Sequence, residues 1–145
     1  MSIFVLIISF LCLGCSLLAM KKLFKSNSRM QEDFIKSYDQ SIKTIEDNKI
    51  YNFTVLLFSI IYTGMWVHFY VIAFNVFNYE WMVLSLVAVF FLLQSIYGFF
   101  RGLSMFAKKE IKSGLFNRVL NVVELVYVVY FIYYYVVIFS SRGLS

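Results

Sequence analysis

Residues 50–79 read IYNFTVLLFSIIYTGMWVHFYVIAFNVFNY and contain no Lys, Arg, Asp or Glu. An α-helix needs about 20 mostly apolar residues to cross the roughly 30 Å hydrocarbon core of a bilayer. This stretch is longer than that, and it lacks the strict alternation of apolar and polar residues that a transmembrane strand requires. It therefore predicts a membrane-spanning helix over residues 51–78.

Three further segments repeat this pattern. Residues 2–20 and 81–100 contain no charged side chain, and residues 119–140 contain only Glu124. We therefore expect an all-α integral membrane protein with four transmembrane helices, over about residues 2–20, 51–78, 81–100 and 119–140. In this interpretation the chain, residues 1–145, forms a single membrane domain.

The composition supports the same conclusion. Of the 145 residues, 61% are hydrophobic and 14% are charged. Average soluble domains contain about 45–50% apolar and about 25% charged residues by a similar count. A chain of this size cannot bury so much apolar surface in one core, which excludes a soluble enzyme, a disulfide-stapled secreted domain and a disordered tail.

The basic residues predict the topology. Residues 21–49 hold seven of the 13 Lys and Arg, and residues 101–118 hold five. The positive-inside rule assigns both of these segments to the cytoplasm, so the two termini and the turn at residues 77–80 face outward. We expect a multi-pass protein of a bacterial cytoplasmic (inner) membrane. The net charge of +5 then reflects orientation, and we expect no nucleic acid as a partner.

An amphipathic cytoplasmic helix is predicted over residues 29–48, between the first and second spans. Ser28 and Gln31 match a capping box at its start. Apolar residues recur at helical spacing along one face, namely Phe34, Tyr38, Ile42 and Ile45. Because the helix lacks the basic polar face of a lipid-bound helix, we expect this apolar face to dock a cytoplasmic protein or a second copy of the chain. The alternative is a connector that rests on its own bundle.

Glu124 is the most informative polar residue, because a carboxylate within a span is by default a functional-site hypothesis. Asn121 shares its helix face, and Gln94 of the third span lies at a similar distance from the basic end. We therefore predict a Glu124–Gln94 hydrogen bond with Asn121 beside it. Two interpretations stay open: a polar contact that holds helices together, and a pore, proton or ligand site.

Other candidate residues have more ordinary explanations. His68 is the fourth member of the predicted intramembrane polar site, and we expect it to bond a tyrosine of the fourth span, with a water-linked relay to Glu124 as the alternative. Gly98 and Gly102 form a GxxxG motif, which lets helices approach closely. Cys12 and Cys15 lie inside an apolar span and are expected to be buried thiols. Because the chain holds two Cys and one His, we expect no metal site and no cofactor.

One enzyme family offers an alternative. Arg118, Asn121 and Glu124 resemble the Arg…Asn…Glu triplet of the MAPEG glutathione-transferase family, which are small four-helix membrane proteins with a basic first cytoplasmic loop. That family carries the triplet on its second helix, with one more residue between Arg and Asn. The resemblance implies a membrane enzyme acting on lipid or glutathione conjugates.

Our main expectation is a small protein that is not an enzyme. It forms a homo-oligomer, serves as the membrane subunit of a larger complex, or does both. A sensor, an ion channel and an immunity or phage-defence (antiviral) component all fit this size and aromatic content. The expected partners are the lipid bilayer, further copies of the chain and a cytoplasmic protein.

Overall fold

The computed structural model describes residues 3–44, 48–77, 81–111, 113–139 and 141. Within these ranges the chain is helical apart from short connections, and it contains no strand. The elements, in order, are α1 (Ile3–Met20), α2 (Asn27–Thr44), α3 (Asn48–Phe77), α4 (Met82–Lys108), α5 (Leu115–Tyr133) and the π-helical η1 (Tyr134–Phe139).

Four of these helical stretches are long and apolar enough to cross a membrane: Ile3–Met20, Lys49–Phe77, Met82–Lys108 and Leu115–Val137. The predicted all-α class, four candidate spans and a polar helix after the first of them are therefore confirmed. The boundaries differ most in α4, which continues past residue 100 to Lys108 because Gly102 alone does not stop a helix. Lys109 follows the last residue of α4 and caps it with a left-handed backbone, with φ of 53°.

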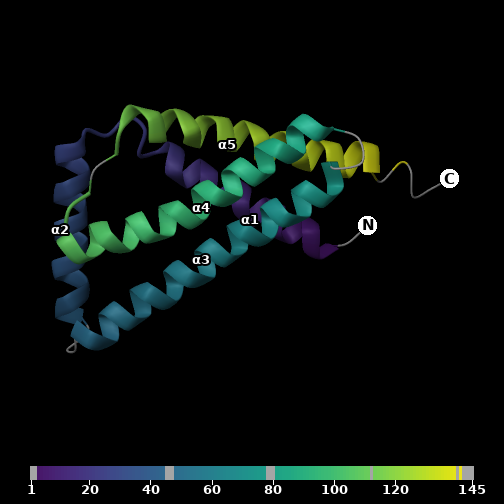
Figure 1. Cartoon of the computed structure of the whole chain (residues 1–145). Coiled ribbons are helices and arrows are strands. Elements are labelled where there is room, and N and C mark those ends of the chain that lie inside the picture. Colours follow the sequence, from purple (N-terminus) through teal and green to yellow (C-terminus); the bar gives the residue numbers. More distant parts are fainter. Residues whose placement is uncertain (1–2, 45–47, 78–80, 112, 140, 142–145) are drawn as a thin grey trace.

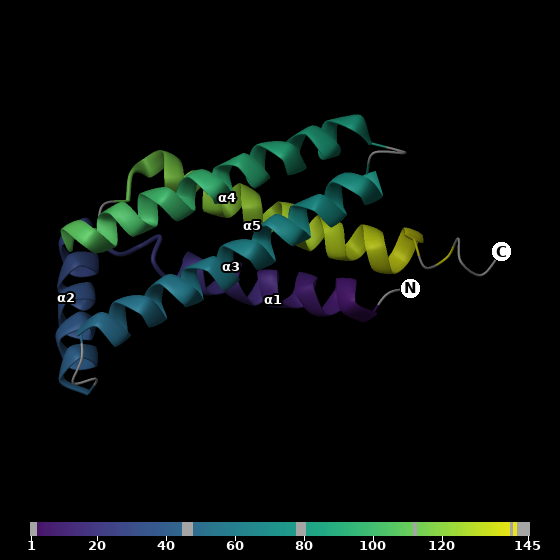
Figure 2. The same cartoon turned by 60° about the horizontal axis from the view of Figure 1, so that its bottom comes forward.

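The axes of the long helices are roughly aligned, and α2 lies across one end of them (Figure 1). Helices α3 and α4 form a hairpin whose arms meet near its turn and diverge towards α2, as both ribbon views show (Figure 2). Helices α1 and α5 pack side by side along the hairpin. Helix α1 begins and α5 ends at the end opposite α2, so both predicted basic segments lie at the α2 end.

The opposite end is filled by interlocking aromatic rings. Small buried residues let α3 and α4 approach there, namely Ala73, Ser85 and Ala88. Phe77 contacts four rings of α5 and η1: Tyr127, Tyr130, Phe131 and Tyr134. Their centroid distances of 5.0–6.2 Å are within the range of favourable aromatic pairs. The bundle is therefore solid at this end.

The apolar face of α2 packs on the chain itself. Phe34 and Tyr38 lie against Phe106 of α4, with ring centroids 6.2 Å and 6.0 Å away, and Tyr38 also meets Tyr51 of α3 at 5.4 Å. Within the chain Phe34 and Tyr38 therefore contact the ends of α3 and α4, as the connector interpretation expects, and docking of a partner on this face stays a prediction. Ile45 and the side chain of Ile42 lie outside the described residues.

The predicted capping box is wrong. Helix α2 begins at Asn27, and the hydroxyl of Ser26 accepts a hydrogen bond from the Arg29 N–H at 3.4 Å. Gln31 points elsewhere, as described below. The sequence does not show which serine precedes the helix, because Ser26 and Ser28 are equally good capping residues by type.

Candidate functional site

A cavity of about 870 Å³ occupies the space between the diverging arms of α3 and α4. Helix α5 forms its third side, and Lys22, Met30, Ile111 and Ser113 line it at the α2 end. Its deep end reaches Trp66, Phe91 and Glu124, next to the aromatic packing. The rings beyond that point fill the bundle, so the cavity opens at the α2 end and is closed by packed side chains towards the other.

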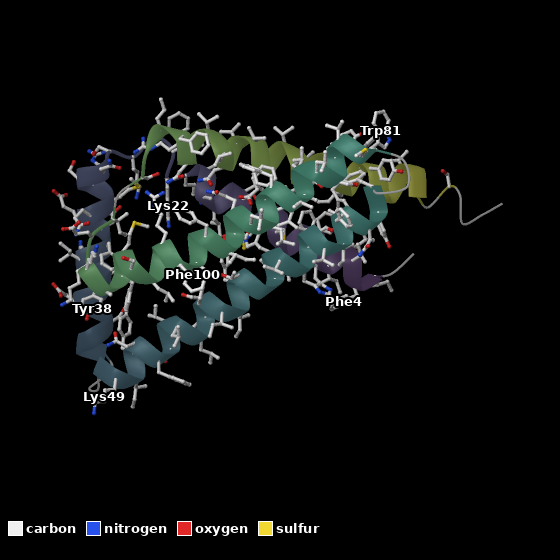
Figure 3. All side chains as sticks on the ribbon, viewed as in Figure 1. Phe4, Lys22, Tyr38, Lys49, Trp81 and Phe100 are labelled. Carbon is white, nitrogen blue, oxygen red and sulfur yellow. The ribbon has the colours of Figure 1, made fainter. Side chains whose placement is uncertain are left out.

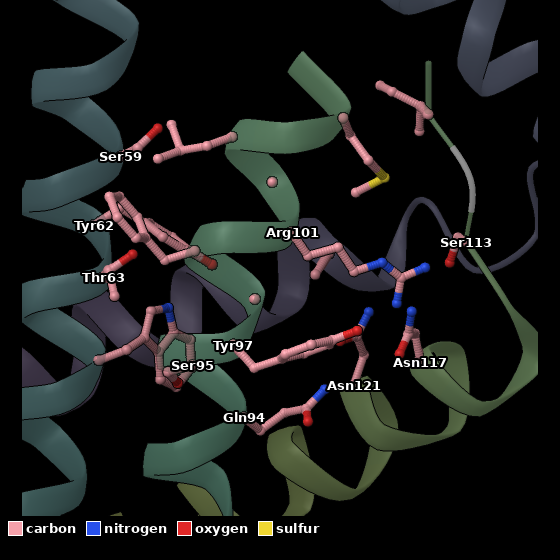
Figure 4. A pocket seen from close by; sticks show the side chains of 18 of the residues that line it. Ser59, Tyr62, Thr63, Gln94, Ser95, Tyr97, Arg101, Ser113, Asn117 and Asn121 are labelled. Atoms are coloured by element: carbon pink, nitrogen blue, oxygen red, sulfur yellow. The ribbon is translucent and has the colours of Figure 1, made fainter. Parts of the chain in front are cut away.

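One wall of the cavity is polar. It consists of the α4 and α5 side chains Gln94, Arg101, Asn117, Asn121 and Glu124. Figure 4 shows the first four of these. The Arg101 guanidinium points towards Asn117, and with the amide oxygen of Asn117 turned to face it, Nη1 donates to that oxygen at 2.5 Å and Nη2 at 3.3 Å. The wall thus offers amide donors and acceptors beside a fixed positive charge.

The facing wall on α3 is largely aromatic. Tyr51, Phe58, Tyr62 and Trp66 line it at helical spacing. Two hydroxyls on the same wall donate hydrogen bonds to backbone carbonyls of α3 itself. Ser59 donates to the Val55 carbonyl at 2.8 Å, and Thr54 donates to the Ile50 carbonyl at 2.8 Å. A ligand between the walls would meet ring faces on one side and hydrogen-bonding groups on the other.

Glu124 does not bond Gln94 as predicted. The Tyr70 hydroxyl donates to Oε1 of Glu124, and Gln94 lines the cavity beside them without a hydrogen bond to any described residue. Asn121 lines the same cavity, so the predicted polar face of α5 is real but its pairing is different.

The reason is geometric. Matching Glu124 with Gln94 by distance from the basic end assumes that the helices are parallel and start in one plane. Helix α3 instead crosses the bundle obliquely relative to α5 (Figure 1), which brings Tyr70 from deep in α3 to Glu124. The sequence offers no signal for this pairing beyond the presence of a tyrosine on α3.

Helix α2 is tied to the α4–α5 connection at the mouth of the cavity. The Gln31 amide donates to the Lys109 carbonyl at 2.5 Å, and its oxygen accepts the Ile111 N–H at 2.6 Å. The side chain of Asn27 accepts the Ser113 N–H at 3.4 Å. The ammonium of Lys109 lies 4.7 Å from the ring centroid of Tyr38.

Arg118 completes this connection from α5. Its guanidinium donates to the carbonyls of Leu23 and Lys25 at 2.9 Å and 3.0 Å, and to the Asn27 side chain at 3.3 Å. We call the set Asn27, Gln31 and Arg118 the latch. Residues Met30, Ile111 and Ser113 line the cavity next to it, so the cavity wall and the latch are built from adjoining residues.

This position of Arg118 separates the triplet that resembles the MAPEG family. Asn121 and Glu124 line the cavity, whereas Arg118 holds the connection between α1 and α2 and is not among the lining residues. The three side chains therefore do not converge on one ligand position.

His68 and the glycines of the GxxxG motif have surroundings different from those expected, whereas Cys12 is buried as predicted. His68 is exposed and packs against Phe4 of α1 with ring centroids 5.6 Å apart, because its side of α3 faces α1 and not the tyrosines of α5. Gly98 and Gly102 face the cavity, and a Cβ added to either would meet no atom within 4 Å. Within this chain the motif therefore adjoins open space and brings no helix close. Cys12 is fully buried in the core.

The basic residues Lys22 and Lys49 lie at the α2 end with Tyr38, whereas Phe4 and Trp81 lie at the other end (Figure 3). Among the described residues, no three His, Cys, Asp or Glu side chains gather as a metal site. The positive charge at the mouth comes from Lys22 and Arg101.

No protein-family model, curated protein or solved structure matches this chain.

Proposed function

We propose that the chain is a multi-pass membrane sensor, without enzymatic activity, that binds a ligand in the cavity and reports it through α2. The observation that carries this proposal is the shared boundary of cavity and latch: Met30 of α2 lines the cavity, and so do Ile111 and Ser113, whose N–H groups bond α2 side chains. A ligand at the mouth would touch the residues that hold α2 in position.

The size and lining of the cavity support a binding role. Small-molecule sites usually have volumes of about 300–1,000 Å³, mostly apolar walls and a few convergent polar groups. The cavity of about 870 Å³ with Arg101, Gln94 and Asn121 on one wall fits this description. The packed aromatic end favours a sensor over an ion channel formed by one chain, because Phe77 and its neighbours fill the continuation of the cavity.

The proposed orientation places α2 in the cytoplasm of a bacterial inner membrane. Its support is the charge distribution, since the segments that contain 12 of the 13 Lys and Arg lie at the α2 end. Single cysteines at Ser2 and Ser145, in a protein lacking Cys12 and Cys15, should react with an impermeant maleimide outside intact cells. A cysteine at Ser41 should react only after the membrane is opened, and reaction from outside would overturn this orientation.

The receiver of the signal is proposed to be a cytoplasmic protein or a second copy of the chain at the outer face of α2. Its exposed residues include Glu32, Ile35, Lys36 and Asp39. This face carries both charge signs around Ile35, which is 45% exposed. Such a mixed surface is typical of the rim of a protein interface.

The cavity glycines allow a direct test of the sensor. Gly98→Leu and Gly102→Leu add side chains into open space, so both variants should fold while occupying the cavity. Gly64→Leu is the matched control, because Gly64 also meets nothing within 4 Å and does not line the cavity. Hydrogen exchange of α2 amides in lipid nanodiscs should change in the two cavity variants and not in the control. Equal exchange in all three variants would refute the coupling of cavity and α2.

A further inference from the structure

We infer that the ligand of this cavity is an anionic membrane lipid whose phosphate lies at Arg101 and whose acyl chain lies along the aromatic wall of α3. This inference rests on the proposed membrane location and binding role, and it names the class of ligand. Three features of the cavity carry it: the charge at its mouth, its opening between α3 and α4, and its length.

The charge at the mouth suits a phosphate. Lys22 and Arg101 are the charged lining residues at the α2 end, and the acidic lining residue, Glu124, lies at the deep end with its carboxylate held by Tyr70. Asn117 lies against the Arg101 guanidinium, and Ser113 lies beside both (Figure 4). A planar guanidinium with flanking amide and hydroxyl groups is the usual arrangement for binding phosphate oxygens.

Besides its mouth at the α2 end, the cavity is open sideways between the two arms of the hairpin. Phe58 of α3 and Tyr97 of α4 both line it, yet they are 67% and 59% exposed. The arms diverge at this level in both ribbon views. In a membrane this opening would face lipid, so a lipid can enter with its chain between the arms while its headgroup stays at the mouth.

The length of the cavity fits an acyl chain. From Arg101 to Phe91, which lines the deep end, α4 spans 10 residue steps, or about 15 Å at about 1.5 Å per residue. One leaflet contributes about 15 Å of the roughly 30 Å hydrocarbon core. A chain entering at the mouth can therefore run past Phe58 and Tyr62 and reach Trp66. A free inorganic phosphate would leave this apolar length unfilled.

Trp66 provides the test, because it lines the deep end of the cavity and is 4% exposed, so bulk lipid does not reach it. The protein would carry Trp81→Phe, which removes the only other tryptophan. It would be reconstituted in phosphatidylcholine with increasing fractions of phosphatidylglycerol brominated in its acyl chain. Fluorescence of Trp66 should be quenched at low fractions and the quenching should saturate. Brominated phosphatidylcholine should quench far less at the same fractions.

Headgroup selectivity is tested at Arg101. Arg101→Gln should raise the lipid fraction for half-quenching by about tenfold, the effect of losing one charge-assisted interaction. Arg101→Lys should keep part of the selectivity. Lys108→Gln is the control, since it removes the same charge from the same end of α4 outside the cavity lining. In this variant the brominated lipid should quench Trp66 at the same fractions as in the parent.

Three outcomes would overturn the inference. They are equal quenching by both brominated lipids, unchanged selectivity in Arg101→Gln, and reversal of the quenching by excess inorganic phosphate, which would indicate a free anion as the ligand. The test is separable from that of the sensor. If Gly98→Leu changes hydrogen exchange in α2 but brominated phosphatidylglycerol does not quench Trp66, the sensor proposal stands and the lipid ligand is rejected. If Trp66 is quenched but α2 exchange does not change, the lipid ligand stands and the sensor proposal is rejected.

Discussion

The two ends of the bundle are built from similar residues and have opposite character. At the end opposite α2, the small residues Ala73 and Ala88 bring the helices together, and rings such as Phe77 and Phe131 interlock between them. At the α2 end, aromatic residues such as Tyr51, Phe58 and Tyr62 are also present, but the helices diverge and leave a cavity. Aromatic side chains alone therefore do not make the helices of a bundle pack tightly. Rings pack when small residues on the neighbouring helix let the backbones approach.

The largest predicted effect separates the two ends. Phe77→Ala should lower the free energy of unfolding by about 2–3 kcal/mol, less than the roughly 3–5 kcal/mol of such changes in soluble cores, because detergent or lipid solvates the unfolded segment. Phe58→Ala, the same change at the cavity, should have little effect, because Phe58 is 67% exposed. Thermal unfolding in mild detergent measures both, and equal losses would mean that the cavity end is packed.

The next prediction concerns the latch. Arg118→Ala removes three hydrogen bonds to the α1–α2 connection and should cost about 1–2 kcal/mol. Hydrogen exchange in α2 should rise, while exchange in the aromatic end stays as in the parent. Arg29→Ala, an exposed arginine on α2, is the control and should leave exchange unchanged. Slow exchange of α2 in Arg118→Ala would show that the ring contacts of Tyr38 hold α2 without the latch.

A smaller effect is expected where the two ends meet, at Tyr70 and Glu124. Glu124→Gln keeps an oxygen that can accept the Tyr70 hydrogen bond and should leave stability close to that of the parent. Glu124→Ala and Tyr70→Phe should each cost about 1 kcal/mol, within the range for hydrogen bonds between membrane helices. The double variant should cost less than the sum of the two losses. A stable Glu124→Gln protein that no longer binds ligand would assign the carboxylate to the ligand and not to the helix contact.

The smallest predicted effect concerns pH. The Lys25 ammonium lies 2.6 Å from the Asp33 carboxylate and lowers the pKa of that carboxyl. A carboxyl with a lowered pKa in the folded state stabilises the fold above its unfolded pKa and loses this contribution as pH falls through the folded value. Asp33→Asn should therefore increase exchange at the start of α2 slightly at neutral pH and not in strong acid. Asp39→Asn is the control, and a difference that persists in acid would contradict the ion pair as its cause.

The helical class, the candidate spans and the clustering of basic residues in two segments are all predictable from the sequence. Each of these depends on a property counted along the chain, such as the length of an apolar run or the position of a charge. The polar face of α5 was predictable for the same reason, because Asn117, Asn121 and Glu124 recur at helical spacing and the structure places all three on the cavity.

Which side chains contact one another depends on how the helices are arranged in three dimensions. The oblique course of α3 pairs Tyr70 with Glu124 and turns His68 towards Phe4, and neither contact follows from spacing within one helix. The divergence of α3 and α4 leaves Gly98 beside open space, although the same motif closes helix pairs elsewhere. Helical periodicity fixes the face on which a residue lies, but the tilt and offset of the neighbouring helix determine what that face touches. These depend on the sizes of all the packed side chains together, and no local pattern encodes them.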